Sequence, residues 1–123
     1  IELLQDVSSY RPNVDIIPSL ANIFDNQENS YACVVIKNGK LIGFGSIFFV
    51  RRLRGGLTAV IEDVVVAASD RRKGVGQAII YSLLDVARAK NCFKVSLEAN
   101  QSAEPFYLAA GFVKAGRVMK FML

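Results

Sequence analysis

The hydrophobic and polar positions predict two β-strands joined by a tight turn in the first half of the chain. Residues 31–37 are rich in β-branched side chains, which is typical of a strand. The pair Asn38-Gly39 follows and is the strongest short signal for a hairpin turn. Residues 40–50 are the predicted return strand, and Gly43 and Gly45 within it indicate a bulge or a close approach of another segment.

The pattern then changes from that of a strand to that of a helix. After a break at Gly55-Gly56, residues 57–67 are predicted as a long strand that ends in a fully buried Val-Val-Val run. From Gly74 onwards apolar residues recur every three or four positions, which predicts an amphipathic helix that ends near Lys90. The apolar stripe of this helix contains Val75, Ile79, Leu83, Val86 and Ala87.

The remaining elements are shorter. In residues 93–97 the apolar Phe93, Val95 and Leu97 alternate with polar residues, which predicts another strand. Pro105 suits the first turn of a short helix and Gly111 the position just past its end. Residues 113–123 are predicted to form one or two closing strands, and residues 17–24 a short helix.

These elements together predict an α/β (α+β) fold in a single domain, residues 1–123. The strand–helix–strand part should form a right-handed parallel crossover, and the hairpins should add antiparallel strands. We therefore expect a mixed, mostly antiparallel sheet flanked by helices. A chain of 123 residues with 52% hydrophobic content is large enough for one compact core and too small for two domains.

The composition narrows the possible chemistry. The chain has no histidine, which excludes Ser-His and Cys-His mechanisms and most transition-metal sites, so no metal is expected. A general acid or base must then be a carboxylate, a tyrosine, a cysteine or a lysine. Cys33 and Cys92 are too few for a disulfide framework and favour a reducing compartment. We expect them to be inert thiols in or beside strands.

No membrane or targeting signal is visible in the sequence. No apolar run reaches the roughly 18 residues that a membrane span needs. The chain opens with acidic Glu2 and Asp6, unlike a secretory leader, although it begins at Ile1 and its natural start can lie further upstream. The expected location is the cytoplasm, without a membrane partner.

Positive charge gathers in two clusters, one of Arg51, Arg52 and Arg54 and one of Arg71, Arg72 and Lys73, within a net charge of +4. A nucleic-acid partner is disfavoured, because no interleaved aromatic stripe and no recognition helix accompany them. The second cluster begins the segment Arg71, Arg72, Lys73, Gly74, Val75, Gly76 and Gln77, which lies between the buried strand and the helix. The N–H groups of a helix N-terminus bind anions, and the two glycines allow close approach, so we predict a pyrophosphate site.

Two better-known nucleotide motifs do not fit this segment. A dinucleotide fingerprint needs a third glycine where the chain has Ile79, and a Walker loop needs Lys-Ser/Thr after Gly76. A basic turn without a ligand is the remaining alternative, and the flanking strand and helix disfavour it.

Glu62 and Asp63 form an acidic pair inside an otherwise apolar strand. In an extended strand they should point to opposite faces. A buried charge must be paired or functional, so at least one of them is a candidate for chemistry. The alternative is a residue at the rim that pairs with an arginine.

Several segments resemble the Gcn5-related N-acetyltransferase (GNAT) superfamily. The residues Ile61-Glu62-Asp63-Val64-Val65-Val66, a short turn, R-x-x-G-x-G and a helix are similar to its acetyl-CoA-binding motif. Within the superfamily, residues 61–66, residues 91–98 and the pairs Phe106-Tyr107 and Gly111-Phe112 resemble the glucosamine 6-phosphate N-acetyltransferases. The resemblance is clear over about residues 56–116 and extends to the first fifty residues only in element order.

The resemblance implies a set of roles. The backbone of Val64, Val65 and Val66, on a strand that splays from its neighbour, would bind the pantetheine and the acetyl carbonyl of acetyl-CoA. Tyr107 would donate to the leaving thiolate. Glu62 and Asp63 would contact the sugar hydroxyls and the amine, and one of them would accept its proton. Lys94 and Glu98 match substrate-side positions. The resemblance also implies a homodimer that acetylates a small-molecule amine, with glucosamine 6-phosphate expected.

The chain also departs from the pattern of these sugar-phosphate enzymes. Ala103 stands where they have an asparagine, and the final residues 119–123 lack the arginine that helps to hold the sugar phosphate. Lys120, or the cluster of Arg51, Arg52 and Arg54, is a candidate to replace that arginine. An acetyltransferase for another amine, such as a polyamine or a peptide, and a non-catalytic acetyl-CoA-binding module remain alternatives.

Overall fold

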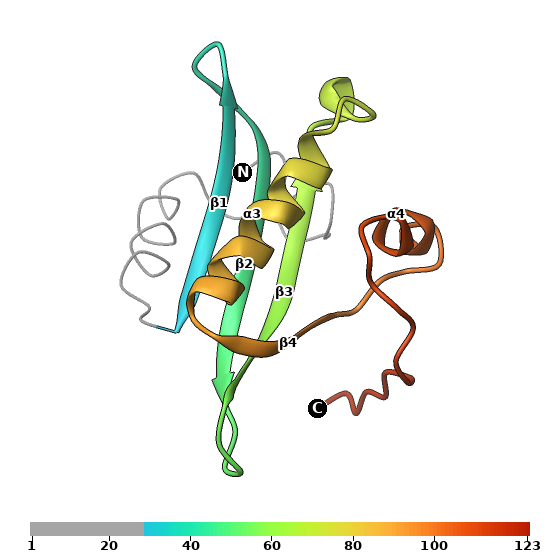
Figure 1. Ribbon diagram of the computed structural model, residues 1–123. Coiled ribbons are helices and arrows are strands. Elements are labelled where there is room, and N and C mark those ends of the chain that lie inside the picture. The colour runs from blue at the N-terminus through green and yellow to red at the C-terminus, as the bar shows by residue number, and fades with distance from the viewer. Residues whose placement is uncertain (1–28) are drawn as a thin grey trace.

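The computed structural model describes residues 29–123, so the short helix predicted at residues 17–24 lies outside the described residues. A four-stranded sheet is built in the order β1 (Ser30–Lys37), β2 (Lys40–Arg51), β3 (Leu57–Val66) and β4 (Cys92–Leu97) (Figure 1). The pairs β1–β2 and β2–β3 are antiparallel, and β3–β4 is parallel. Helix α3 (Val75–Ala89) makes the crossover between β3 and β4. The predicted mixed sheet with a central parallel crossover is confirmed.

The hairpin between β1 and β2 forms where it was predicted. Asn38 has φ 52° and Gly39 has φ 74°, so both central residues are in the left-handed region that a type I′ turn requires. This turn fixes the register that places Lys37 opposite Lys40.

Helix α3 packs on one face of the sheet and closes the core. The buried cluster contains Ile47, Phe49, Ala59 and Ile61 from the strands and Ile79, Ile80, Leu83 and Ala87 from α3. The glycines of β2 make room for this helix. A Cβ atom on Gly43 would lie 2.9 Å from Ile79 Cδ1, and one on Gly45 would collide with Ile79 Cγ2. The close approach predicted from these two glycines is confirmed.

A bulge interrupts β3 beside Gly45. Phe44 pairs with Val65 and Ser46 pairs with Glu62, so β3 has one residue more than β2 between the two pairs. Asp63 absorbs the extra residue with φ 49°, a conformation that aspartate tolerates better than most side chains. The expectation that Glu62 and Asp63 point to opposite faces assumed a regular extended backbone, and Asp63 departs from it. Both residues are exposed.

The bulge also changes the burial of the Val-Val-Val run. Val65 is buried, whereas Val64 and Val66 are only partly buried. The prediction of a fully buried run is therefore wrong at two of its three positions. The reason is that β4 stops pairing with β3 at Ile61–Leu97, so within residues 29–123 the later part of β3 has no strand on that side.

The elements after the helix agree with prediction only in part. Helix α4 (Glu104–Ala109) has Pro105 in its first turn, and Gly111 follows its C-cap with φ 104°, as predicted. Phe93 does not share the buried side of β4 and is 66% exposed, because the register shifts by a residue where β4 begins.

The closing strands predicted at residues 113–123 are absent: this tail carries no strand in the described part of the chain. A strand needs a partner for its backbone groups. In Figure 1 the tail turns back beneath α4 and does not run along an edge of the sheet.

Candidate functional site

A recess of about 650 Å³ opens where β3 and β4 separate. Three segments wall it: Val64, Val65 and Val66 of β3; Arg71, Arg72, Gly74, Gly76 and Gln77 of the turn and α3; and Ala103, Phe106, Tyr107, Ala109 and Ala110 of α4 and its N-cap. Its size is in the range of pockets for small molecules. The splayed strand implied by the family resemblance is thus present, and most of the predicted cofactor-binding residues lie around one opening.

The turn before α3 leads into a helix whose first N–H groups have no acceptor within the helix. Arg72 has φ 64° and Gly74, the N-cap of α3, has φ 83°, which gives the backbone the concave shape of an anion-binding nest. The first helical hydrogen bond runs from Ala78 N–H to Gly74 O at 3.0 Å. The earlier N–H groups of the helix have no acceptor within it, and neither a capping side chain nor an acidic residue occupies its first turn. This end is arranged to bind an anion.

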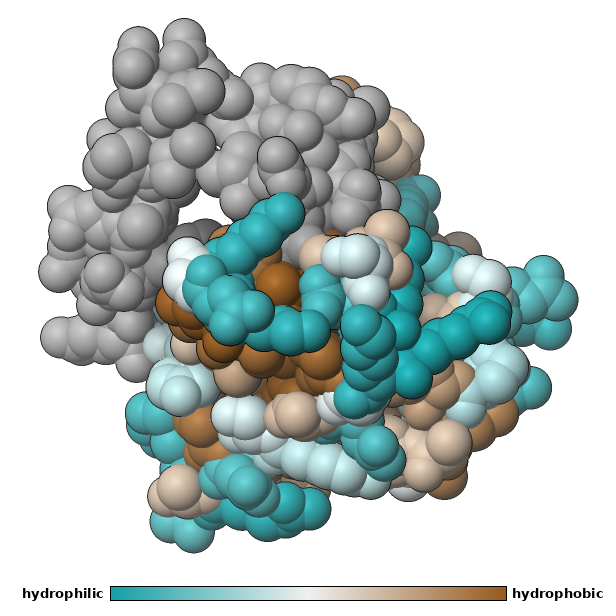
Figure 2. Space-filling view, turned by 90° about the horizontal axis from the view of Figure 1, so that it is seen from above, coloured by the Kyte–Doolittle hydropathy of each residue, from teal (hydrophilic) through white to brown (hydrophobic). Residues whose placement is uncertain are grey.

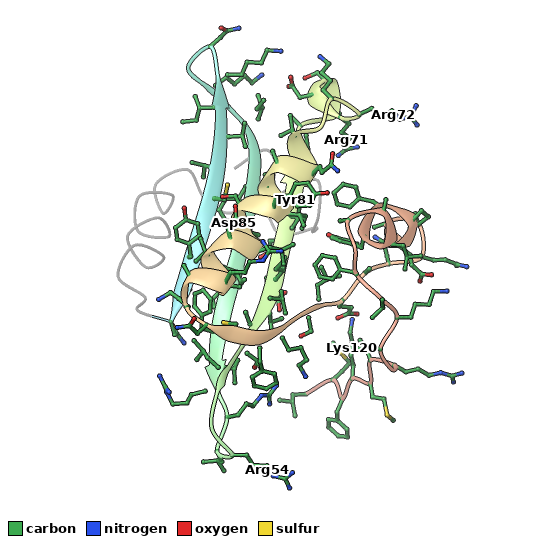
Figure 3. The ribbon with its side chains drawn as sticks, viewed as in Figure 1. Arg54, Arg71, Arg72, Tyr81, Asp85 and Lys120 are labelled. Carbon is green, nitrogen blue, oxygen red and sulfur yellow. The ribbon has the colours of Figure 1, made fainter. Side chains whose placement is uncertain are left out.

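Basic side chains surround the same turn. Arg71 Nε donates to Val66 O at 3.1 Å, which holds the arginine against the end of β3. Arg71 and Arg72 are exposed and lie together at the N-terminal end of α3 (Figure 3). Seen from above, hydrophilic side chains gather over this end of the molecule, with hydrophobic atoms visible between them (Figure 2). Gln77 Nε2 donates to the Tyr81 hydroxyl at 3.0 Å, which steadies another part of the wall.

Two residues of the predicted turn do not line the recess. Lys73 is exposed outside it, and Val75 packs against the core cluster. The side chain of Lys73 still adds positive charge beside the turn, whereas Val75 can contribute only its backbone N–H.

Tyr107 lies on α4, in the wall of the recess opposite α3. Its ring makes edge-to-face contacts with Phe106 (centroids 5.0 Å apart) and Phe112 (5.7 Å), which fix its orientation. Partial burial raises the pKa of the Tyr107 hydroxyl above its usual value of 10.0. Among residues 29–123 no hydrogen-bond partner is found for this hydroxyl. It is therefore a protonated donor, available to a group in the recess.

The four predicted substrate-side residues are exposed and lie outside the walls of the recess. Asp63 directly precedes Val64, so it adjoins the recess along the chain. Within residues 29–123 neither Glu62 nor Asp63 forms an ion pair, so the predicted alternative of a pairing with arginine is not observed there. Glu98 Oε1 pairs with Lys120 Nζ at 3.2 Å, which brings the tail beside the end of β4. Lys94 is exposed on β4.

The arginine cluster of the β2–β3 hairpin is far from the recess. Arg54 lies at the end of the sheet opposite to Arg71 and Arg72 (Figure 3). Arg52 Nε donates to Thr58 Oγ1 at 3.1 Å, which ties this side chain to its own hairpin.

Sequence reasoning did not identify the wall that α4 contributes besides Tyr107. Phe106, Ala109 and Ala110 line the recess, and Phe106 is 38% exposed. The sequence does contain a signal for this wall. Two adjacent alanines, Ala109 and Ala110, end a short apolar helix, and such small side chains leave space beside the helix.

Other types of site are not found in the described residues. Within residues 29–123 no group of three or more His, Cys, Asp or Glu side chains could hold a metal ion. No helix there is long and apolar enough to span a membrane. Cys33 and Cys92 are free thiols, and burial raises the pKa of Cys92 although Lys90 opposes this, which disfavours a nucleophilic thiolate.

Comparison with known proteins identifies the family of this chain. The family model described as acetyltransferase (GNAT) family matches residues 2–112. The glucosamine 6-phosphate N-acetyltransferase of Trypanosoma brucei brucei is 34% identical over 131 residues, which cover 100% of this chain and 86% of the relative. That of Schizosaccharomyces pombe is 33% identical over 100 residues, which cover 78% of this chain and 90% of the relative. A solved acetyltransferase from Trypanosoma brucei has a TM-score of 0.89 at 29% identity, covering 99% of this chain and 89% of that chain.

Proposed function

Because this chain belongs to the acetyltransferase (GNAT) family, we propose that it transfers the acetyl group of acetyl-CoA to the amine of glucosamine 6-phosphate, a step of amino sugar metabolism. One observation carries the proposal. A single recess joins an anion-binding turn, the edge of β3 from which β4 has separated and a protonated tyrosine. The names of the relatives in Trypanosoma brucei brucei and Schizosaccharomyces pombe support the choice of amine.

The pyrophosphate of acetyl-CoA would bind at the turn. The N–H groups at the start of α3 and the guanidinium groups of Arg71 and Arg72 supply hydrogen bonds and positive charge on the same side. Gly74 and Gly76 keep side chains out of the contact between the phosphates and the backbone. The amide groups of the pantetheine arm would pair with β3 at Val64, Val65 and Val66, as an added strand does.

The transfer itself needs few protein groups. The amine nitrogen attacks the thioester carbon, a C–N bond forms, and the carbonyl oxygen takes up negative charge. A backbone N–H of β3 at the opening of the recess would donate to that oxygen. The C–S bond then breaks, and the Tyr107 hydroxyl gives its proton to the thiolate. The products are the N-acetyl sugar phosphate and CoA.

The nitrogen must lose a proton during this reaction, and Asp63 or Glu62 is proposed to receive it. Asp63 adjoins Val64 through the bulge, and both carboxylates are exposed and without an ion pair in residues 29–123. The proton passes through solvent to the tyrosinate, which restores both groups for the next turnover. Lys94 and Glu98 are proposed to contact the sugar.

Lys120 is proposed to bind the phosphate of the amine substrate. It lies on the tail beneath α4 and reaches Glu98, whereas Arg54 lies at the far end of the sheet (Figure 3). The Lys120 side chain is 65% exposed, so an incoming phosphate can compete with Glu98 for it.

We also propose that the protein is a homodimer. Apolar side chains of the tail are exposed in the single chain, Met119 by 93%, Phe121 by 87% and Met122 by 84%. A second copy would cover them and provide the strand partner that residues 113–123 do not find among residues 29–123.

The two free thiols support a further proposal, that the protein works in the cytoplasm. Cys33 and Cys92 are both half-buried and unpaired with each other. A reducing compartment keeps such thiols in this state.

The test is an assay of thiol release from acetyl-CoA with glucosamine 6-phosphate as acceptor. Unphosphorylated glucosamine, a polyamine and a peptide amine serve as comparison acceptors. We expect the highest kcat/KM with glucosamine 6-phosphate. No turnover with glucosamine 6-phosphate, together with rapid acetylation of another amine, would refute the proposed substrate but not the membership of the family. CoA binding without turnover of any amine would instead favour a non-catalytic binding module.

A further inference from the structure

Asp70 is a buried carboxylate within the most basic segment of the chain. It ends the short 3₁₀ helix η2 (Ala68–Asp70) and directly precedes Arg71, Arg72 and Lys73. Its residue surface is only 7% exposed. A buried carboxylate is unfavourable unless its oxygens are satisfied, so the contacts of Asp70 need an explanation.

Both carboxylate oxygens of Asp70 have partners, and Asp70 does not line the recess. Oδ2 accepts a hydrogen bond from Ser69 Oγ at 3.0 Å, and Oδ1 pairs with Lys37 Nζ at 3.5 Å. Asp70 does not belong to the walls of the recess, whereas the next residue, Arg71, does. The Ser69 hydroxyl and the nearby charges of Lys37 and Lys73 hold the pKa of Asp70 below its usual value of 3.8, so it is ionised at neutral pH.

The partner of Asp70 comes from another part of the sheet. Lys37 is the last residue of β1, beside the Asn38-Gly39 turn. Just before η2, the Ala67 N–H donates to Ile42 O of β2 at 2.8 Å, which ties the backbone there to the sheet. The ion pair therefore fastens the start of the anion-binding turn to the tip of the β1–β2 hairpin.

We propose that Asp70 and Lys37 are a positioning pair for the diphosphate of the coenzyme. The pair fixes the point from which Arg71 and Arg72 enter the recess and from which the backbone turns into α3. The inference rests on the proposed function, because it takes a CoA diphosphate to be the anion at this turn.

The sign of the effect separates this role from simple electrostatics. A carboxylate beside an anion site repels the anion, so its neutralisation on that ground alone would tighten binding. A positioning role predicts the opposite, weaker binding after neutralisation. A role in folding alone predicts lower stability with equal affinity for ligands with and without the diphosphate.

The test measures the dissociation constants of CoA and of pantetheine, which lacks the diphosphate, by calorimetry on the wild type and on Asp70→Asn. We expect Asp70→Asn to weaken CoA binding by about five-fold, the upper range for a partly exposed ion pair, and to leave pantetheine binding unchanged. Lys37→Met should have the same effect, and the double variant should be no weaker than either single variant, since the two residues act as a unit.

Asp85→Asn is the matched control. Asp85 is also an aspartate in an ion pair, with Arg88 at 2.9 Å, but it lies on the exposed side of α3 away from the turn (Figure 3). Asp85→Asn should leave CoA binding unchanged. Equal or tighter CoA binding by Asp70→Asn would overturn the positioning role. If Asp70→Asn does not fold, Asp70→Glu decides the question, because it keeps the charge and moves the carboxylate: a positioning role predicts weaker CoA binding, and electrostatics alone predicts no change. A wild type that binds no CoA would overturn the proposed function as well.

Discussion

At the scale of single residues, Tyr107 is where the proposed chemistry can be tested most directly. We expect Tyr107→Phe to lower kcat by about 100-fold, the usual contribution of a positioned general acid, and to leave CoA affinity unchanged. The ring stays, so the edge-to-face contacts with Phe106 and Phe112 should persist. Tyr31→Phe, at an exposed tyrosine of β1, is the control and should change neither quantity. An unaltered kcat in Tyr107→Phe would remove the tyrosine from the mechanism.

The same residue predicts a pH dependence. In the proposed mechanism the Tyr107 hydroxyl acts in its protonated form, and burial raises its pKa above 10.0. As pH increases towards 10, more of the amine substrate becomes neutral while the tyrosine keeps its proton. We therefore expect any loss of kcat at high pH, measured with both substrates saturating, to be centred above pH 10.0. A decline centred below that value would show that another group is the acid.

Lys120 makes the substrate proposal testable at a residue for which the family resemblance provides no model. Lys120→Met should raise KM for glucosamine 6-phosphate by about ten-fold, as expected for the loss of a charged hydrogen bond, with no change for unphosphorylated glucosamine. Lys114→Met is the matched control, since Lys114 is also exposed and paired, with Glu104 at 2.8 Å. Equal effects of Lys120→Met on both acceptors would mean that the lysine does not bind phosphate.

At the scale of elements, the contact between α3 and β2 depends on the absence of two side chains. Gly45→Ala should destabilise the fold by about 1–3 kcal/mol through overpacking, because the new Cβ meets Ile79 Cγ2, an atom that is fixed at a branched carbon. Gly43→Ala should be milder, since its Cβ meets Ile79 Cδ1 at 2.9 Å, the movable end of the same side chain. Urea unfolding measures the free energy of unfolding of both variants. A larger loss of stability in Gly43→Ala than in Gly45→Ala would contradict this packing.

Elements that depend on local sequence could be predicted, and those that depend on a distant partner could not. The Asn38-Gly39 turn, the length of α3 and Gly111 after α4 follow from backbone preferences of the residues themselves. The bulge at Asp63 arises from the pairing of β3 with β2 and has no signal in the acidic pair alone. The partial exposure of Val64 and Val66 depends on where β4 departs, so a run of valines could not reveal it.

The residues of the candidate site also divide into those that the sequence predicts and those that it does not. The turn and Tyr107 were predicted because a glycine pattern and a family resemblance lie in contiguous sequence. The ion pair between Lys37 and Asp70 joins residues 33 positions apart, and periodicity cannot report such a contact. The pair of Glu98 and Lys120 is likewise a consequence of the folded path of the tail.

At the scale of the whole molecule, the proposed dimer depends on the tail. Removal of residues 117–123 takes away Met119, Phe121 and Met122, which are exposed in the single chain. We expect the intact protein to have the mass of a dimer in light scattering, and the shortened protein that of a monomer with retained affinity for CoA. The recess for the coenzyme should survive because its walls end at Ala110. A monomeric intact protein would refute the proposed dimer.

The turn before α3 has a consequence for how such enzymes diverge. The anion site is built largely from main-chain N–H groups, which every amino acid except proline carries. Random substitution along this segment therefore erodes coenzyme recognition slowly, as long as the glycines at the left-handed positions persist. The proposed acceptor side consists of individual side chains on β3, β4 and the tail, where a single replacement would change which amine fits. A lineage with this architecture can acquire new acceptors over time while it inherits one donor.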